Sequence, residues 1–194
     1  ANATNDTAFA TGATIILGKA TGATNTSIKL SGDAEGASSA SSYDGIIDTT
    51  GKVTLDSQIQ TSAGVYLNTN VELKGAITEL VLTGGGAQST TVDATVDLKE
   101  VGSAVALTSL DASGFVGNLS VADSVFAAEA SIELGSTDNV LTMEVAGLAR
   151  DASTITDNGG TDTLSVAGLG VSGATAIRVD TTDIETFDLA LVRA

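Results

Sequence analysis

The sequence predicts an all-β fold in which most of the chain forms a parallel β-solenoid. Three observations predict this fold: apolar and polar residues alternate in short segments, Gly, Asn and Asp punctuate those segments, and related phrases return along the chain. "NVLTMEVAGL" at 139–148 returns as "DTLSVAGLG" at 162–170. Solenoids are typically built from strands that recur along the chain with changes in sequence and that bury their inner faces only against one another. A β-sandwich is the alternative fold, especially for residues 1–75.

Alternation with a period of two is clearest in "KVTLDSQIQ" at 52–60. Val53, Leu55 and Ile59 share one face of this segment, whereas Lys52 and Asp56 share the other, so a half-buried strand is expected. Further strands are predicted at 13–17, 26–30, 43–48, 64–73, 77–83, 90–98, 139–145, 161–166, 175–179 and 184–192.

"LTSLDASGFVGNLSV" at 107–121 shows how often the chain turns. Gly114 and Gly117 would each cost about 1 kcal/mol inside a helix, and the apolar positions lack a helical period. This stretch therefore predicts a strand, a corner and a second strand.

Two segments could form short helices, 123–134 ("DSVFAAEASIEL") and 145–153 ("VAGLARDAS"), while the small polar segment 32–45 predicts a loop. Residues 1–75 are expected to form an amino-terminal β region with an exposed tail, and the more repetitive residues 76–194 a solenoid-like region. One continuous domain is the alternative.

Composition limits the interior and the chemistry. Hydrophobic residues make up 42% of the 194 residues but aromatic residues only 3%, which indicates a narrow core of aliphatic side chains. The absence of Cys and His excludes thiolate nucleophiles, Ser-His relays and the usual zinc sites. The most plausible remaining enzyme class is a glycoside hydrolase, in which a pair of carboxylates cleaves a polysaccharide. Because the chain has no Trp to stack on sugars, we expect no catalysis.

The net charge of −16 argues against nucleic acid or an anionic membrane as a partner, because phosphate binding needs clustered Lys and Arg. No apolar run approaches the length of a membrane span. The chain starts with Ala, so either a leader has been removed or the chain is an excised piece. With Asp and Glu outnumbering Lys and Arg by 24 to 8, hard cations are the expected partner.

Three phrases carry a resemblance: "LTSLDASGFVGNLSV", "TMEVAGLARDASTITDNGGTDTLSV" and "VDTTDIETFDLAL". They resemble the β-strand repeats of bacterial surface-layer (S-layer) proteins and of calcium-dependent RTX-type secreted proteins, over residues of about 76–192. The resemblance implies a secreted, self-assembling coat or matrix protein whose parallel solenoid turns are tied by Ca²⁺. In the RTX nonapeptide pattern laid on 157–165, Asp162 takes the Asp position and Asp157 replaces the first Gly. "GSTDNVLT" at 135–142 is a poorer copy that offers Asp138.

The residues themselves also favour calcium. "TDNGGTD" and "VDTTD" combine carboxylates with Gly-rich or polar loops, which can supply the six to eight oxygens that Ca²⁺ takes. The candidate metal ligands are Asp138, Asp157, Asp162, Asp180 and Asp183. The alternative for each is a turn-forming role. Asp93 and Asp97 are expected on a solvated face.

The absence of Pro leaves every strand able to offer a full row of donors and acceptors, although a general bias in composition explains it as well. The predicted function is a structural, extracellular or cell-surface subunit that associates with itself through strand edges and divalent cations.

An adhesin or polysaccharide-binding module is the alternative function, with Thr91 and Thr95, or Thr161 and Thr163, as binding faces. A tail of residues 1–12 that inserts Phe9 into a neighbour's sheet is a second mode of assembly. Four Asn residues lie in glycosylation triplets: Asn2, Asn5, Asn25 and Asn118.

Overall fold

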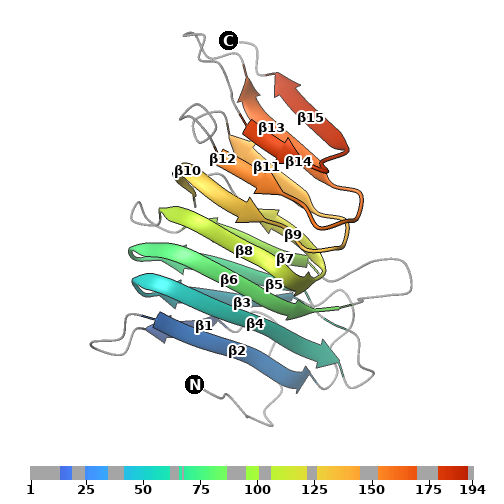
Figure 1. Cartoon of the computed structure of the whole chain (residues 1–194). Coiled ribbons are helices and arrows are strands. Elements are labelled where there is room, and N and C mark those ends of the chain that lie inside the picture. The colour runs from blue at the N-terminus through green and yellow to red at the C-terminus, as the bar shows by residue number, and fades with distance from the viewer. Residues whose placement is uncertain are drawn as a thin grey trace.

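The computed structural model of this protein describes most of the chain. The described residues are 14–18, 25–34, 42–61, 66, 68–86, 95–100, 106–121, 126–144, 153–169 and 179–191. They form fifteen β-strands, β1 to β15, which are shown in Figure 1. No helix long and apolar enough to span a membrane occurs among these residues.

The strands form three parallel sheets, and successive strands alternate between opposite sides of the molecule. The first sheet contains β1 (Thr14–Gly18), β3 (Ser42–Asp48), β5 (Asn68–Lys74), β7 (Thr95–Glu100) and β9 (Asn118–Val121). The second sheet contains β2 (Asn25–Ala34), β4 (Gly51–Thr61), β6 (Ile77–Gly85), β8 (Leu107–Val116), β10 (Phe126–Glu133), β12 (Ser153–Thr156) and β14 (Val179–Thr182). The third sheet contains β11 (Val140–Glu144), β13 (Thr163–Leu169) and β15 (Thr186–Leu191).

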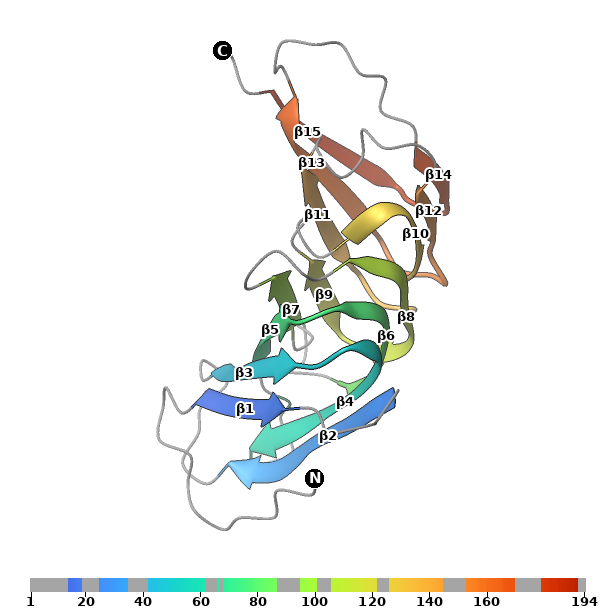
Figure 2. The ribbon, with the colours of Figure 1, turned by 90° about the vertical axis from the view of Figure 1, so that its left-hand side faces the viewer.

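The third sheet lies on the same side as the first, because β11 contacts β9. The chain therefore winds as a parallel β-solenoid, with one strand on each side in every turn, as Figures 1 and 2 show. This confirms the predicted fold.

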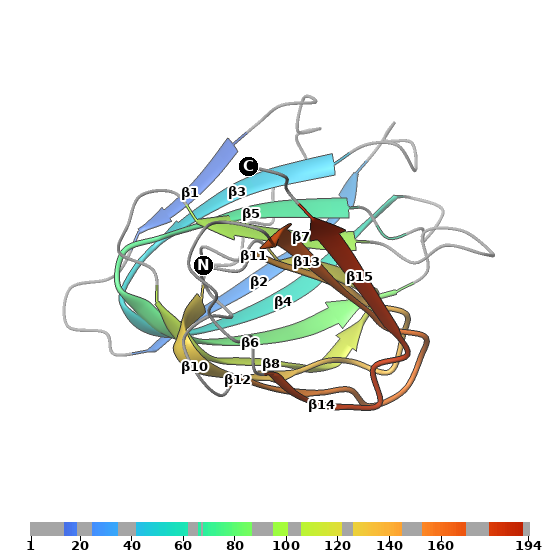
Figure 3. The same ribbon diagram turned by 90° about the horizontal axis from the view of Figure 1, so that it is seen from above.

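The core lies between the two sides and consists mainly of stacked aliphatic side chains. Figure 3 views the stacked strands from above. One row crosses the second sheet from turn to turn: Val53, Leu80, Leu110, Ile132 and Ile155. All five side chains are buried. Removing apolar surface from water stabilises the fold by roughly 25 cal/mol per Å². Because each strand buries its inner face only against its neighbours, the stack supports itself only when several turns are present.

The alternation predicted for residues 52–60 is confirmed. Val53, Leu55 and Ile59 of β4 are buried, while Lys52 and Asp56 lie on the outer face. The backbone of β4 pairs in parallel with β2 on one edge and with β6 on the other.

Two predictions about local structure need correction, and a third lies almost entirely outside the described residues. The helix predicted at 123–134 is wrong over β10, because Ile132 stacks between Leu110 and Ile155 and strand pairing there buries more than an isolated helical face would. The loop predicted at 32–45 is shorter than expected, since 32–34 end β2 and 42–45 begin β3. The second predicted helix, 145–153, lies outside the described residues except for Ser153, which begins β12.

The sandwich alternative for residues 1–75 is wrong for the described strands of that region, because these strands pair in parallel. Both sheets also continue past residue 75: β4 pairs with β6, and β5 pairs with β7.

Candidate functional site

The candidate site lies where the chain crosses from the second sheet to the third. Residues 134–139 connect β10 to β11, and residues 157–162 connect β12 to β13 in the next turn. We call these two segments together the acidic corner. The Leu134 N–H donates to the Thr156 carbonyl oxygen at 2.8 Å, and the Thr163 N–H donates to the Asn139 carbonyl oxygen at 2.9 Å. The two segments therefore stack directly on each other.

Polar side chains and glycine shape the acidic corner. Gly160 has a φ of +122°, and a Cβ there would lie 2.7 Å from the Thr137 carbonyl oxygen, so only glycine fits. The Asn158 side-chain amide donates to the Leu134 carbonyl oxygen at 2.8 Å. Asp157 Oδ2 accepts from the Gly159 N–H at 2.7 Å. The sequence "DNGG" thus produces a tight turn that holds Asp157 pointing inward.

Asp162 is completely buried, with 0% of its surface exposed. Its Oδ1 accepts the Asn139 N–H at 2.8 Å, and its own N–H donates to Glu185 Oε2 at 2.8 Å. Asn139, Asp162 and Glu185 each come directly before a strand of the third sheet, 23 residues apart. A carboxylate in one turn thus accepts from the backbone of the turn before it.

Three buried side-chain oxygens at the acidic corner have no hydrogen-bond donor among the described residues. They are Asn139 Oδ1, Asp157 Oδ1 and Asp162 Oδ2. Their side chains are only 1%, 4% and 0% exposed. A buried polar atom without a partner costs about 1–3 kcal/mol, and a buried charge costs more. The acidic corner is therefore a concentrated source of instability unless something else contacts these oxygens.

The pKa of Asp162 reflects this environment. The pKa of this carboxyl group is raised from 3.8 to about 6, chiefly by burial and also by the neighbouring Asp157 carboxyl group, against the lowering effect of the hydrogen bonds from Asn139. A protonated Asp162 can hydrogen-bond the Asp157 carboxylate, so the two carboxyl groups adjoin each other.

The structure brings together two of the five predicted metal ligands, Asp157 and Asp162. Asp138 belongs to the same corner but is exposed, and its Oδ1 accepts the Thr161 N–H at 2.8 Å. Asp183 is exposed with a φ of 61°, which fits a turn-forming role, and the backbone of Asp180 pairs with Thr154 in the second sheet. Among the described residues, no group of three or more Asp, Glu, His or Cys could hold a metal ion.

Asn139 is the residue that sequence reasoning missed. It stands at the same distance before Leu141 as Asp162 stands before Leu164, and both Leu side chains are buried in register. The repeated phrases at 139–148 and 162–170 already contained this equivalence. Aligning those phrases would have placed Asn139 next to Asp162.

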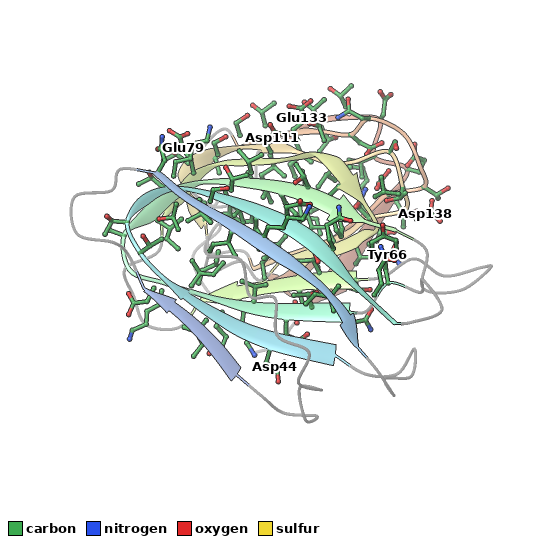
Figure 4. All side chains as sticks on the ribbon, turned by 90° about the horizontal axis from the view of Figure 1, so that it is seen from below. Asp44, Tyr66, Glu79, Asp111, Glu133 and Asp138 are labelled. Carbon is green, nitrogen blue, oxygen red and sulfur yellow. The ribbon has the colours of Figure 1, made fainter. Side chains whose placement is uncertain are left out.

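The outer faces of the sheets carry other acidic side chains. Figure 4 shows Glu79, Asp111 and Glu133 projecting from the second sheet and Asp44 projecting from the opposite side. Asp111 and Glu133 are register partners on adjacent strands, so two like charges lie side by side there. Asp97 is half-buried and accepts a hydrogen bond from Ser120 at 3.0 Å.

β14 and β15 are the last described strands at the carboxy-terminal end of the solenoid. Phe187 of β15 occupies the inward position that Leu141 and Leu164 occupy in the two preceding turns. Those Leu side chains are 1% exposed, whereas Phe187 is 52% exposed. In the described part of the chain, β14 and β15 each end their sheet and have one unpaired edge.

Comparisons of the chain with protein-family models, curated proteins and solved structures found no match.

Proposed function

We propose that this protein is a structural, extracellular or cell-surface subunit that assembles with copies of itself, as in an S-layer, a filament or a matrix, with divalent cations promoting assembly and no catalytic role. The observation that carries the proposal is the carboxy-terminal end of the described stack, where Phe187 is half-exposed at a core position and β14 and β15 each have an edge without a described partner strand.

Open ends of parallel sheets favour further stacking. A free strand edge offers a row of N–H and C=O groups to another chain, and natural proteins usually block such edges with Pro, charge or a covering segment. This chain contains no Pro. Another molecule that pairs with β15 would bury Phe187 in the way that each turn buries the Leu below it. Contact between two different ends is heterologous, and heterologous contacts extend into filaments.

The charge of the chain explains the proposed role of the cation. A net charge of −16 on 194 residues makes copies repel each other, and divalent ions such as Ca²⁺ screen that repulsion. We therefore expect polymers in millimolar calcium and dispersed subunits in excess chelator. Electron microscopy and sedimentation of the same preparation under both conditions test this. Single compact particles at high concentration in every salt would contradict the proposal.

A pair of matched variants tests the open end. Phe187→Ser removes the exposed core side chain at the end, whereas Val116→Ser removes a side chain of similar exposure, 49% against 52%, in the middle of the stack. We expect Phe187→Ser to lower polymer yield and Val116→Ser to leave it unchanged. The opposite pattern would place the contact on the lateral surface.

Adhesion is a second candidate function, in which the protein binds a cell-surface polysaccharide. The observation that favours it is a polar row on the outer face of the first sheet, where Asn70 donates to Asp44 Oδ1 at 2.7 Å and Ser120 to Asp97 Oδ1 at 3.0 Å. Such a row can hydrogen-bond sugar hydroxyls. Glycan-array binding that Asn70→Ala abolishes, in protein that stays monomeric, would favour this function.

A further inference from the structure

We propose that the acidic corner is an internal calcium site, whose protein ligands include Asn139 Oδ1, Asp157 Oδ1 and Asp162 Oδ2. The site ties residues 134–139 to residues 157–162 of the following turn, and so clamps two adjacent turns of one molecule. It gives the cation-dependent assembly proposed above a defined binding site, but calcium binding here requires no second copy of the chain.

The donor set fits a hard cation. Ca²⁺ binds six to eight oxygens from carboxylates, amide carbonyls, backbone carbonyls and water. The acidic corner offers two carboxylates and one amide oxygen, all buried and all without a hydrogen-bond donor among the described residues. Main-chain carbonyls of the corner and water are expected to complete the coordination. The site contains no nitrogen or sulfur ligand that would favour zinc.

A proton or a single water satisfies these oxygens less completely than a cation does. A proton shared by Asp157 and Asp162 would leave Asn139 Oδ1 without a partner. A water molecule can donate two hydrogen bonds to the three oxygens and leaves both negative charges buried. A divalent cation contacts all three oxygens and neutralises both carboxylates.

The ligands match those expected from the sequence only in part, since Asp157 and Asp162 were predicted and Asn139 was not. Asp157 stands where the repeat pattern carries Gly, and Asn139 is not an acidic residue. Asp138, which the sequence also offered, points to solvent at the same corner and already accepts the Thr161 N–H. Figure 4 shows Asp138 on the outside of the molecule.

Isothermal titration of monomeric, chelator-treated protein with CaCl₂ tests the site. We expect one Ca²⁺ bound tightly per chain, and an affinity at least tenfold lower in Asp162→Asn and in Asp157→Asn. Asp138→Asn is the matched control, because it removes a carboxylate from the same corner but from its exposed side. Its calcium affinity should equal that of the unmodified protein.

Thermal unfolding keeps the inference testable if a variant folds poorly. In chelator, Asp162→Asn should melt at a higher temperature than the unmodified protein, because it removes a buried charge. With calcium, the order should reverse, since only the unmodified protein gains the ion. A variant that melts at a lower temperature by the same amount in both conditions would show a purely structural role and overturn the inference.

Two other results would also overturn it: no tight calcium binding by the unmodified protein, or equal loss of affinity in Asp138→Asn and Asp162→Asn. The outcome is separate from the proposed function. Protein that binds calcium at this corner and never polymerises would contradict self-assembly and leave the site established.

Discussion

The amino-terminal and carboxy-terminal turns of this solenoid manage their negative charge differently. Residues 1–100 contain five Lys against eleven Asp and Glu, whereas residues 101–194 contain three Arg against thirteen. The four described ion pairs all lie in the first region and join adjacent turns: Lys29–Asp56, Lys52–Glu79, Lys74–Asp48 and Lys99–Glu72, at 3.1–3.7 Å. Among the described residues from 106 to 191 there is no Lys or Arg.

The difference shows that one architecture accommodates two distributions of charge. The amino-terminal turns carry their own counter-charges on the outer faces of the strands. The carboxy-terminal turns instead bury Asp157 and Asp162 at a corner and place Asp111 next to Glu133 on the surface. We infer that these turns depend on cations from solution, and the predictions below test that difference.

The largest expected effect is the same in both regions, because the core is continuous. Leu98→Ala in β7 and Leu164→Ala in β13 each remove a fully buried side chain, and each should lower the free energy of unfolding by about 2–5 kcal/mol. Denaturant unfolding monitored by circular dichroism measures both. A much smaller loss for Leu164→Ala would mean that the carboxy-terminal turns unfold separately from the rest.

A smaller effect, confined to the carboxy-terminal turns, is the pH dependence of stability in chelator. The pKa of Asp162 is about 6 in the folded protein and 3.8 in the unfolded chain. The folded state therefore binds the proton more tightly, and stability increases as the pH falls. Between about pH 7 and pH 5, this group should contribute about 1.4 kcal/mol of added stability, equivalent to one pKa unit.

Asp162→Asn isolates that contribution, because the groups around Asp162, namely Asp157, Asp138 and Glu185, remain. The difference in melting temperature between the variant and the unmodified protein should shrink as the pH is lowered in chelator. A difference that stays constant from pH 7 to pH 5 would mean that Asp162 titrates as an exposed carboxylate does.

The smallest expected effect comes from the ion pairs of the amino-terminal turns. Lys74 Nζ lies 3.1 Å from Asp48 and Lys99 Nζ lies 3.2 Å from Glu72, and all four side chains are partly or largely exposed to water. Lys74→Met and Lys99→Met should each cost about 0.2–1 kcal/mol, and less at high salt. Calcium should leave these differences unchanged. If calcium reversed the loss of stability in these variants, the ion would also bind on these outer faces.

The strands could be predicted from the sequence because alternation is a local property, and the phrases that return along the chain indicated how the strands stack. Val53, Leu55 and Ile59 lie on one face of any strand, whatever the strand pairs with. The same reasoning failed at residues 126–133, where "FAAEASIE" is compatible with a helix and the decisive contacts, with Leu110 and Ile155, lie one turn away.

The acidic corner was only partly predictable for the same reason. The turn sequence "DNGGTD" singled out Asp157 and Asp162, but it did not distinguish them from Asp138 and Asp183, which the fold exposes. Burial depends on how consecutive turns stack, and that requires the register between β11 and β13. The register also identifies Asn139, which a search for acidic residues passes over.

Hydrogen exchange on monomeric protein, with and without calcium, tests most directly whether the two regions differ as proposed. We predict that calcium slows exchange in residues 134–142 and 153–165, on both sides of the acidic corner, and leaves residues 42–60 unchanged. Equal slowing in both regions would indicate general charge screening instead of a site. No change in either region would contradict the dependence of the carboxy-terminal turns on a cation.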